Sequence, residues 1–331
     1  MDSCPAPVRK LDRTSIRELT EAADALLAAY RSPHHPRLLR SLPAAAATLG
    51  HSLRHLVRPV DAPDGICLLR GLPVDDDAIG PTPGHWSTAG RAGAFWDVVL
   101  LLLGTLRGRP IAWQGQQNGR FVHNIVPSPG HEQEQTGASS DVLLSPHTED
   151  AFHPGRAHLL MLGCLRNHDR VATTAASIRH TALDPADVAL LCEPLLPILP
   201  DDSYATARAS ALRPPPVRTL WPSETGLTLR FDPAYTPLDQ APPAHRAAYA
   251  RLERELARVT VTVRLTPGDI LLVDNDVTVH GRVPFRARYD GTDRWLKRAS
   301  VHIPDNRTRP PEELREHGYG QAALVAPGPA D

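Results

Sequence analysis

Short apolar runs alternate with turn residues over most of the chain. Their length and their Gly, Pro and Asn boundaries are typical of β-strands, whereas a few longer stretches repeat apolar residues at helical spacing. The predicted strands cover residues 65–73, 111–114, 116–127, 157–165, 171–178, 217–220, 227–231, 260–265, 270–274 and 295–303. The predicted helices cover residues 15–30, 38–56, 91–106, 184–192 and 242–259. Many short strands with a few helices outside them predict a mainly β fold with flanking helices and a double-stranded β-helix, or jelly-roll, core.

The order of these elements divides the chain into three segments. Ser15 and Glu18 are spaced to form a capping box at the start of the first helix, after a loose lead-in over residues 1–12. The irregular stretch 199–216, with three consecutive prolines, is predicted to be a lid over the site of the β domain. The predicted segments are an N-terminal helical segment packed on the core (1–60), the β-helix domain (61–305) and a loose C-terminal tail (306–331).

Composition and charge narrow the classes of partner. The chain has 331 residues, of which 41% are hydrophobic, enough for a large domain with a real core. Its net charge of −1 argues against nucleic acids and anionic membranes as partners. The four cysteines lie far apart, and the N-terminus has no apolar signal segment, so reduced thiols and a cytoplasmic location are predicted.

The candidate chemistry centres on His147 and Glu149, in the segment Ser-Pro-His-Thr-Glu-Asp-Ala-Phe-His-Pro (145–154). Residues two apart in an extended segment point to the same side, so an imidazole and a carboxylate would meet at one point. A third ligand should come from a distant strand, and the best candidate is His280, in Val-Thr-Val-His-Gly-Arg (277–282). Two histidines and one carboxylate form the facial triad of non-haem Fe(II) oxygenases, but zinc also binds such sets.

A cation downstream of the last histidine favours iron. Arg294 follows His280 by fourteen residues. An Fe(II)/2-oxoglutarate enzyme needs a cation for the distal carboxylate of its co-substrate, and the planar guanidinium of arginine binds carboxylates bidentately. A zinc hydrolase has no such need. The alternative for Arg294 is a surface ion pair with Asp290 or Asp293, which would contribute little.

Together these residues resemble the clavaminate synthase-like family, which includes the free arginine and asparagine β-hydroxylases and lies within the taurine-dioxygenase-like group. The resemblance covers roughly residues 60–305 and implies a jelly-roll oxygenase that uses Fe(II), 2-oxoglutarate and O2. The metal ligands implied are His147, Glu149 and His280. The segments that carry the resemblance are His-Thr-Glu-Asp-Ala-Phe-His-Pro (147–154), Cys-Leu-Arg-Asn (164–167) and Val-His-Gly-Arg (279–282), with Arg294 and Arg298.

The resemblance also implies contacts to the co-substrate and to a substrate carboxylate. Arg294 would bind the 5-carboxylate of 2-oxoglutarate with the help of the Thr174 hydroxyl, and the neighbouring Thr173 is the alternative. Arg298 lies four residues beyond Arg294, so both face the same way if the segment is a strand. The resemblance implies that Arg298 binds the α-carboxylate of an amino acid.

Further substrate contacts are implied in the turn and the loop before the metal ligands. Gln117, chosen over Gln116, would lie near the α-amino group of the amino acid. Ser140, or its neighbour Ser139, would help from the loop 128–146. These residues stand in a Gln-Gln-Asn-Gly turn and in a Gly- and Ser-rich loop, and loops of this length are often functional.

The side chain of the substrate is the least defined feature. Asp232, in Arg-Phe-Asp-Pro-Ala (230–234), matches the segment that reads the side chain in the family. Members that take basic or amide side chains tend to carry an acid two residues later, where this chain has Ala234. Asp202, or Asp201, could supply the missing negative charge from the predicted lid. A solvated turn residue is the alternative for both Asp201 and Asp202.

The function implied is hydroxylation of an unactivated C–H bond, at Cβ or Cγ of a free L-amino acid, in specialised-metabolite biosynthesis. Desaturation or oxidative ring closure at the same site is an alternative outcome. A carrier-tethered amino acid or a molecule of another class is an alternative substrate. A non-oxidative cupin-like metal protein is a further alternative, which would not need Arg294.

Overall fold

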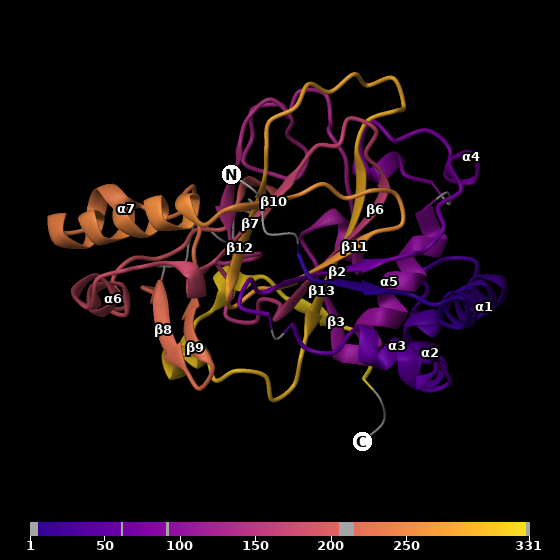
Figure 1. The fold of residues 1–331 in the computed structure, drawn as a ribbon, viewed down its shortest axis with the longest axis horizontal. Helices are drawn as coiled ribbons and strands as arrows, with labels where there is room; N and C mark the ends of the chain where they lie inside the picture. Colours follow the sequence, from indigo (N-terminus) through magenta and orange to yellow (C-terminus); the bar gives the residue numbers. More distant parts are fainter. Residues whose placement is uncertain (1–5, 61, 91–92, 205–214, 329–331) are drawn as a thin grey trace.

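Two β-sheets that pack face to face form the centre of the protein (Figure 1). The structure, a computed structural model, describes residues 6–60, 62–90, 93–204 and 215–328. Apolar side chains from both sheets form one buried cluster, in which Leu160 and Val273 of the larger sheet meet Ala175 of the smaller one. A mainly β fold with several helices, as predicted, is therefore confirmed.

The larger sheet has eight strands, and its neighbours come from distant parts of the chain. Its order is β1-β2-β11-β6-β13-β3-β14, and β4 also pairs with β13. These strands are β1 (Val8–Lys10), β2 (Ile66–Arg70), β3 (Arg109–Trp113), β4 (Val122–Ile125), β6 (Leu159–Arg166), β11 (Ile270–Asp274), β13 (Trp295–His302) and β14 (Ala323–Val325).

The smaller sheet has four strands in the order β10-β7-β12-β5, and a separate hairpin lies beside it. The antiparallel pairing of β7 and β12 places residues 173–177 next to residues 278–282. These strands are β5 (Leu144–His147), β7 (Thr173–Ser177), β10 (Val261–Val263) and β12 (Thr278–Arg282), and the hairpin is β8 (Leu220–Ser223) with β9 (Gly226–Leu229).

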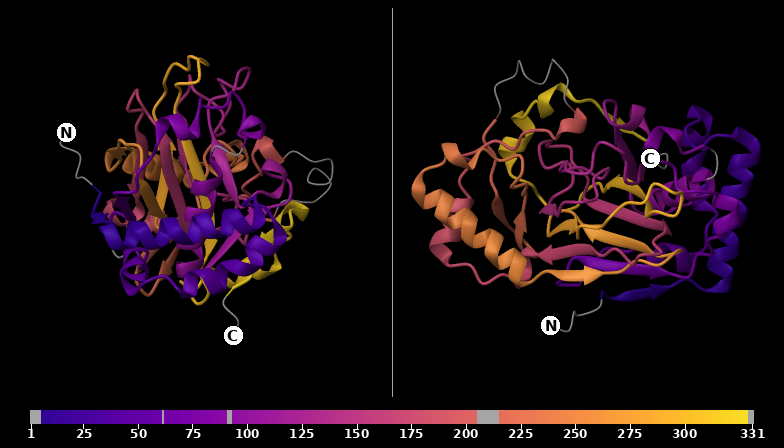
Figure 2. Two further views of the ribbon diagram at one scale, coloured as in Figure 1. Left: turned by 90° about the vertical axis from the view of Figure 1, so that its right-hand side faces the viewer. Right: turned by 90° about the horizontal axis from the view of Figure 1, so that it is seen from above.

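The helices cover the outer faces of the two sheets, at opposite ends of the molecule (Figure 2). α5 is buried on nearly all sides because it lies between the larger sheet and the N-terminal helices. α6 and α7 pack on the smaller sheet and on the hairpin. The helices are α1 (Arg13–Tyr30), α2 (Pro36–Ala47), α3 (His51–Leu56), α4 (Asp76–Ile79), α5 (Ala94–Arg107), α6 (Pro185–Leu191) and α7 (Pro243–Arg258).

The start of the chain differs from the prediction. Part of the predicted lead-in forms β1, which pairs in parallel with β2. Asp12, and not Ser15, caps α1, because its carboxylate accepts a hydrogen bond from the backbone N–H of Ser15 at 2.7 Å. Glu18 is not a capping-box partner, since its carboxylate accepts a hydrogen bond from the N–H of Gly50 at 2.9 Å.

The C-terminal segment is not loose. β14 adds to the larger sheet beside β3, and the residues before it form ion pairs with buried partners. The charges that predict a solvated tail are therefore matched inside the fold. The ion pairs are Arg307 with Asp274, Arg309 with Asp276, Glu313 with Arg156 and Glu316 with Arg230.

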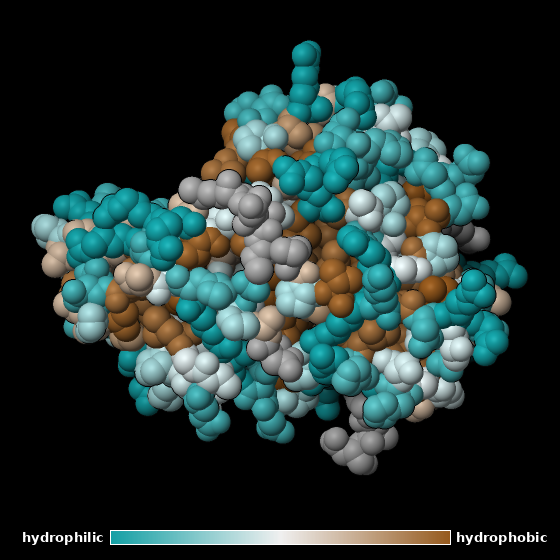
Figure 3. Space-filling view, in the orientation of Figure 1, coloured by the Kyte–Doolittle hydropathy of each residue, from teal (hydrophilic) through white to brown (hydrophobic). Residues whose placement is uncertain are grey.

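The surface and the helices agree with this arrangement. The outward side of α7, at the left of the space-filling view, is mostly hydrophilic, whereas its inner side packs in a buried cluster (Figure 3). Among the described residues, no helix combines the length and the apolar character that a membrane span requires. Cys164 and Cys192 are free thiols.

Candidate metal and co-substrate site

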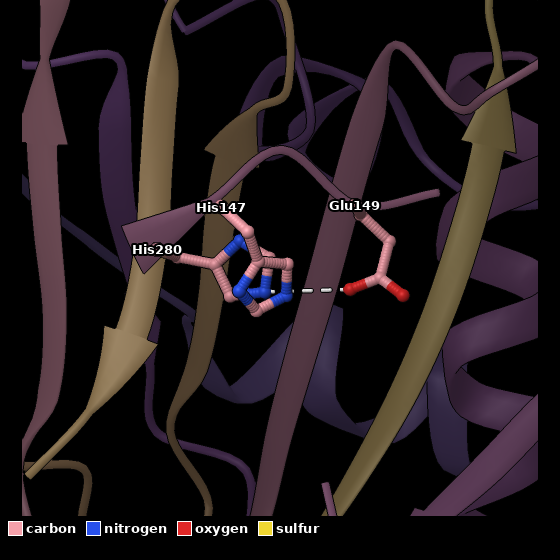
Figure 4. A group of neighbouring side chains, drawn as sticks. All are labelled: His147, Glu149 and His280. Atoms are coloured by element: carbon pink, nitrogen blue, oxygen red, sulfur yellow. Dashed lines mark ion pairs between the residues drawn. The ribbon is translucent and has the colours of Figure 1, made fainter. Parts of the chain in front are cut away.

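Two neighbouring strands bring the predicted metal ligands together. β5 and β12 pair antiparallel, with His147 directly opposite His280. Glu149 lies just beyond the end of β5. One possible ligand atom from each of the three residues lies within 4.8 Å of the others. Figure 4 shows the two imidazole rings and the carboxylate pointing toward one space.

A hydrogen bond of His147 directs the lone pair of its other ring nitrogen into this space. His147 Nδ1 lies 2.8 Å from the carbonyl oxygen of Ser145, which places the proton on Nδ1 and leaves Nε2 as an acceptor. His280 Nε2 lies 3.3 Å from Glu149 Oε2. Burial, followed by the neighbouring His280, lowers the pKa of His147. His147 is therefore neutral near neutral pH, as a metal ligand must be.

Close packing of the smaller sheet requires glycine between His280 and Arg282. A Cβ atom on Gly281 would lie 2.4 Å from the carbonyl oxygen of Leu144 and 2.9 Å from Thr174 Oγ1. The first contact is with backbone, which cannot move aside without disturbing the pairing of β5 and β12. The glycine of the Val-His-Gly-Arg segment thus lets the two histidine-bearing strands approach each other.

A buried arginine holds the carboxylate of Glu149. Arg298 Nη1 lies 2.6 Å from Glu149 Oε1, and Arg298 Nη2 lies 2.9 Å from His123 Nδ1. Burial alone would raise the pKa of Glu149, but Arg298 and the two neighbouring histidines bring it below its ordinary value. Burial and Arg298 lower the pKa of His123 to about 3. Glu149 is therefore ionised and directs Oε2 toward His280.

These side chains open onto a cavity of about 410 Å³. The cavity carries charges of both signs, so it suits a ligand that also carries both. Its cationic lining residues are Arg282, Arg294 and Arg298, and its acidic lining residues are Glu134, Glu149, Asp150, Asp201 and Asp232.

Arg294 contacts Thr173, and not the predicted Thr174. Arg294 Nη2 donates to Thr173 Oγ1 at 2.9 Å, while Nε has no hydrogen-bond partner. Successive side chains of β7 point to opposite faces, so Thr173 lines the cavity and Thr174 points away, toward Gly281. Burial lowers the pKa of Arg294 to about 10, which still leaves it charged at neutral pH. Arg298 shares the cavity face of β13 with Arg294, as its spacing predicts.

A second buried cation lies beside Arg294. Arg282 donates to the carbonyl oxygens of Ser139 and Val142 and to the hydroxyl of Ser139. Burial, followed by the charge of Arg294, lowers the pKa of Arg282 to about 9. Arg282 thus fixes the loop before β5 and adds positive charge to this end of the cavity. The sequence analysis assigned it no role, although it belongs to the Val-His-Gly-Arg segment.

Of the two glutamines in the predicted substrate turn, Gln116 fits the prediction better than Gln117. The amide of Gln117 is used by the backbone of Asn124, whose N–H and carbonyl it binds at 3.0 and 2.9 Å. Both glutamines line the cavity, but the Oε1 of Gln116 is buried without a hydrogen-bond partner among the described residues. A carbonyl oxygen in that state is ready to accept a hydrogen bond from a ligand.

Of the remaining predicted substrate contacts, some line the cavity and others do not. Asp232 lines the cavity. Ser140 does not line it, because its hydroxyl is turned to Asp141 at 3.2 Å. The side chain of Asp202 lies outside the described residues, as does most of the predicted lid. The described end of the lid contributes Asp201 to the cavity wall.

Comparisons with known proteins agree with this geometry. Residues 202–300 match the family model described as taurine catabolism dioxygenase TauD, TfdA family. The chain is 39% identical over 264 residues to the enduracididine beta-hydroxylase of Streptomyces hygroscopicus, which covers 72% of this chain and 76% of that protein. The chain belongs to the TauD/TfdA dioxygenase family. The family predicted from the sequence is thereby confirmed.

Solved structures extend the likeness of this TauD/TfdA dioxygenase to nearly its whole length. The non-haem iron oxygenase OrfP in complex with Fe and α-ketoglutaric acid superposes with a TM-score of 0.79 at 38% identity, over 89% of this chain and 94% of that one. Asparagine oxygenase in complex with Fe(II), 2S,3S-3-hydroxyasparagine and succinate gives a TM-score of 0.81 at 33% identity, over 89% and 93%.

One feature of the TauD/TfdA dioxygenase site has no counterpart in the sequence analysis. The carboxylate of Asp150, next to Glu149, accepts hydrogen bonds from the indole N–H of Trp113 and the hydroxyl of Tyr204, both at 2.7 Å. Asp150 also has a positive φ of 54°. No sequence pattern indicates this cluster, because its members lie far apart along the chain and carry no common motif.

Proposed function

We propose that the protein hydroxylates a free L-amino acid with a cationic side chain, using Fe(II), 2-oxoglutarate and O2. His147, Glu149 and His280 would hold the metal. Their donor set of two imidazoles and one carboxylate fits Fe(II), and Glu149 Oε2 is buried with no hydrogen-bond partner in the described part of the chain, as a ligand atom awaiting a metal would be. When bound, Fe(II) and 2-oxoglutarate supply the oxidation, in which O2 and 2-oxoglutarate yield succinate, CO2 and the hydroxyl group.

Arg294 would bind the distal carboxylate of 2-oxoglutarate, and Thr173 would orient its guanidinium. Arg294 is buried, yet no ion pair involves it among the described residues, and its one hydrogen bond goes to Thr173. A buried cation without a counter-charge is costly, so the site favours an anionic ligand. This unpaired cation beside the triad is the observation that carries the proposal of a 2-oxoglutarate enzyme.

The amino-acid substrate would lie across the same cavity. Arg298 would bind its α-carboxylate, and the unpartnered Oε1 of Gln116 would accept a hydrogen bond from its α-ammonium group. Gln117 and Ser140 are not part of this proposal, because their polar groups are engaged elsewhere.

The acidic wall of the cavity supports a cationic side chain. Asp201 accepts hydrogen bonds from Ser203, Asp232 accepts one from the N–H of Ala234, and neither carboxylate forms an ion pair with an arginine or lysine among the described residues. Burial raises the pKa of Asp232 to about 6, with Asp201 adding to the shift. Burial likewise raises the pKa of Asp201. A guanidinium or ammonium group would relieve this repulsion, whereas the amide of asparagine would not. Asp201 would thus supply the negative charge that this chain, with Ala234, does not have at that position.

A substrate panel tests this proposal. Iron-loaded protein is supplied with 2-oxoglutarate and O2 and with L-arginine, L-ornithine, L-lysine, L-asparagine or L-glutamine, and the product is detected by mass. We expect turnover of a cationic amino acid to a product heavier by one oxygen atom, with a raised KM in Asp232→Asn. Glu134→Gln is the control, since Glu134 lines the cavity but is hydrogen-bonded to His131. Preference for asparagine over every cationic amino acid would contradict the proposal.

We propose that the two facing sheets are a double-stranded β-helix, which the interleaved strand order and the likeness to OrfP support. The division into segments 1–60, 61–305 and 306–331 and the cytoplasmic location stay predictions, as does the place in specialised metabolism. A product lighter by two hydrogen atoms in the panel would indicate desaturation or ring closure.

A further inference from the structure

The turn between β11 and β12 is more deeply buried than a connection between strands usually is. It consists of Asn275, Asp276 and Val277 and follows Asp274, the last residue of β11; the side chains of Asn275 and Asp276 are 0% exposed, and that of Asp274 is also buried. The turn leads directly into β12 and His280. It stands in the segment that carries His280, yet the proposed chemistry assigns it no part. Burying three polar side chains is costly unless each of them is hydrogen-bonded.

Both polar atoms of the Asn275 side chain form hydrogen bonds with the backbone at and near Glu149. Its Oδ1 accepts a hydrogen bond from the N–H of Glu149 at 2.8 Å. Its Nδ2 donates to the carbonyl oxygens of Glu149 and Ala157, each at 3.0 Å. One amide thus binds both polar backbone groups of Glu149. The backbone N–H of Asn275 also donates to the carbonyl of His158 at 3.0 Å.

Glu149 needs such a support because it lies outside the sheet. The pairing of β5 with β12 ends at His147, and Asp150 turns the chain with its positive φ. Thr148 is held from the other side by Phe231, through a backbone hydrogen bond of 2.7 Å and a second bond to its hydroxyl. Without Asn275, the N–H and the carbonyl of Glu149 would have no partner among the described residues.

The turn itself is anchored. Arg307 binds the carboxylate of Asp274 at 2.7 and 2.6 Å, and Arg309 binds Asp276 at 3.1 and 2.9 Å. The Arg307–Asp274 pair is bidentate and so fixes orientation as well as charge, whereas both bonds from Arg309 go to Oδ1 of Asp276. The C-terminal segment therefore holds both neighbours of Asn275 in place.

We propose that Asn275 is a positioning residue for the metal site, which sets Glu149 relative to His280 and so determines metal affinity. The inference rests on the proposed function, because it assumes that Glu149 and His280 are ligands. The reason is geometric. Asn275 lies five residues before His280 on the same turn and strand, and its amide holds Glu149 from the opposite segment. A single residue thus links the two strands from which the ligands come.

Asn167 provides a matched control in the same chain. It is also buried, and its amide makes the same three kinds of bond, to the N–H and carbonyl of Val171 and to the carbonyl of Leu265. Replacing either asparagine by alanine removes three buried hydrogen bonds. Only Asn275, however, contacts a proposed ligand.

The experiment measures Co(II) binding to metal-free full-length protein by calorimetry, together with the visible absorption of bound Co(II) and the thermal stability. Variants are Asn275→Ala, Asn275→Asp and Asn167→Ala. His280→Ala defines binding outside the site, because the chain has 16 histidines. We expect Asn275→Ala to weaken Co(II) binding by roughly 10- to 100-fold and to alter its spectrum, the loss found when groups that orient metal ligands are removed.

Asn167→Ala should lose stability but keep the wild-type dissociation constant and spectrum. Equal weakening in both alanine variants, or unchanged binding in a folded Asn275→Ala protein, would overturn the inference. If Asn275→Ala does not fold, Asn275→Asp decides by the same criteria, since it keeps the acceptor for Glu149 and loses the donor. Wild-type protein that binds no more Co(II) than His280→Ala would instead refute the proposed metal site.

Discussion

Two adjacent threonines of β7 give the sharpest test of the co-substrate site. Among the described residues, Thr173 Oγ1 accepts the one hydrogen bond of the buried Arg294, whereas Thr174 Oγ1 is buried on the other face without a partner. Valine has nearly the same shape as threonine and lacks the hydroxyl. Thr173→Val and Thr174→Val therefore remove the same atom from two neighbouring positions, with opposite expected consequences for stability.

The magnitudes follow from these contacts. Thr173→Val leaves a buried guanidinium N–H unpaired, which costs about 1–3 kcal/mol of stability. It also frees the Arg294 side chain, and ordering it again on binding costs about 0.5–1.5 kcal/mol, or roughly a 2- to 10-fold weaker affinity for 2-oxoglutarate. Thr174→Val removes a hydroxyl that is buried without a partner. It should leave 2-oxoglutarate binding unchanged and stabilise the fold by about 1 kcal/mol.

The assay is anaerobic calorimetry of 2-oxoglutarate binding to Mn(II)-loaded protein, with urea unfolding for stability. Arg294→Gln sets the scale, because loss of one partner of a buried charge pair costs about 2–5 kcal/mol, or more than roughly 30-fold in affinity. Weaker 2-oxoglutarate binding in Thr174→Val than in Thr173→Val would refute the placement of the two residues. A destabilised Thr174→Val protein would refute the claim that its hydroxyl has no partner.

Three further predictions concern substrate binding and the buried charges. Gln116→Ala should raise the KM for the amino acid at nearly unchanged stability, while Gln117→Ala should mainly lower the thermal midpoint. The reverse pattern would favour Gln117 as the residue near the α-amino group. Lys297→Met leaves Asp97 buried without its partner at 2.7 Å and should cost about 3–5 kcal/mol in urea unfolding, whereas the added change Asp97→Leu should recover most of that loss. Burial alone would raise the pKa of Glu313, but its arginine partners bring it below the ordinary value. Ionised Glu313 therefore stabilises the fold above the ordinary carboxyl pKa, and this stabilisation is lost as the pH falls toward the folded-state pKa. Glu313→Gln should flatten the acid limb of a stability–pH profile, and an unchanged profile would contradict this.

The sequence predicted much of the fold because its signals are local. Apolar runs bounded by turn residues located β2, β3, β6, β7, β11 and β13, and helical periodicity located α1, α5 and α7. The strands that carry the metal ligands were harder. Residues 144–147 and 278–282 are short and partly polar, and β5 and β12 exist because each pairs with a strand distant in sequence. The C-terminal segment was misjudged because its partners are buried arginines and carboxylates, which composition does not reveal.

Local spacing likewise predicted some features of the site and could not predict others. Spacing along an extended segment correctly placed Arg294 and Arg298 on one face. It also placed His147 and Glu149 on a shared side, because they are only two residues apart. Spacing could not decide between Thr173 and Thr174, because an error of one residue in strand register reverses the face. Nor could it separate Gln116 from Gln117, since their roles depend on the φ angles of a tight turn and on the backbone of Asn124.

The central claim is that the triad and Arg294 form a working Fe(II)/2-oxoglutarate site. The most direct measurement is succinate formation by protein purified without oxygen and then supplied with Fe(II), 2-oxoglutarate and O2, with and without amino acids. We expect succinate release that a cationic amino acid stimulates and that His280→Ala and Arg294→Ala abolish. Folded, iron-loaded protein that neither binds 2-oxoglutarate nor releases succinate with any amino acid would contradict it.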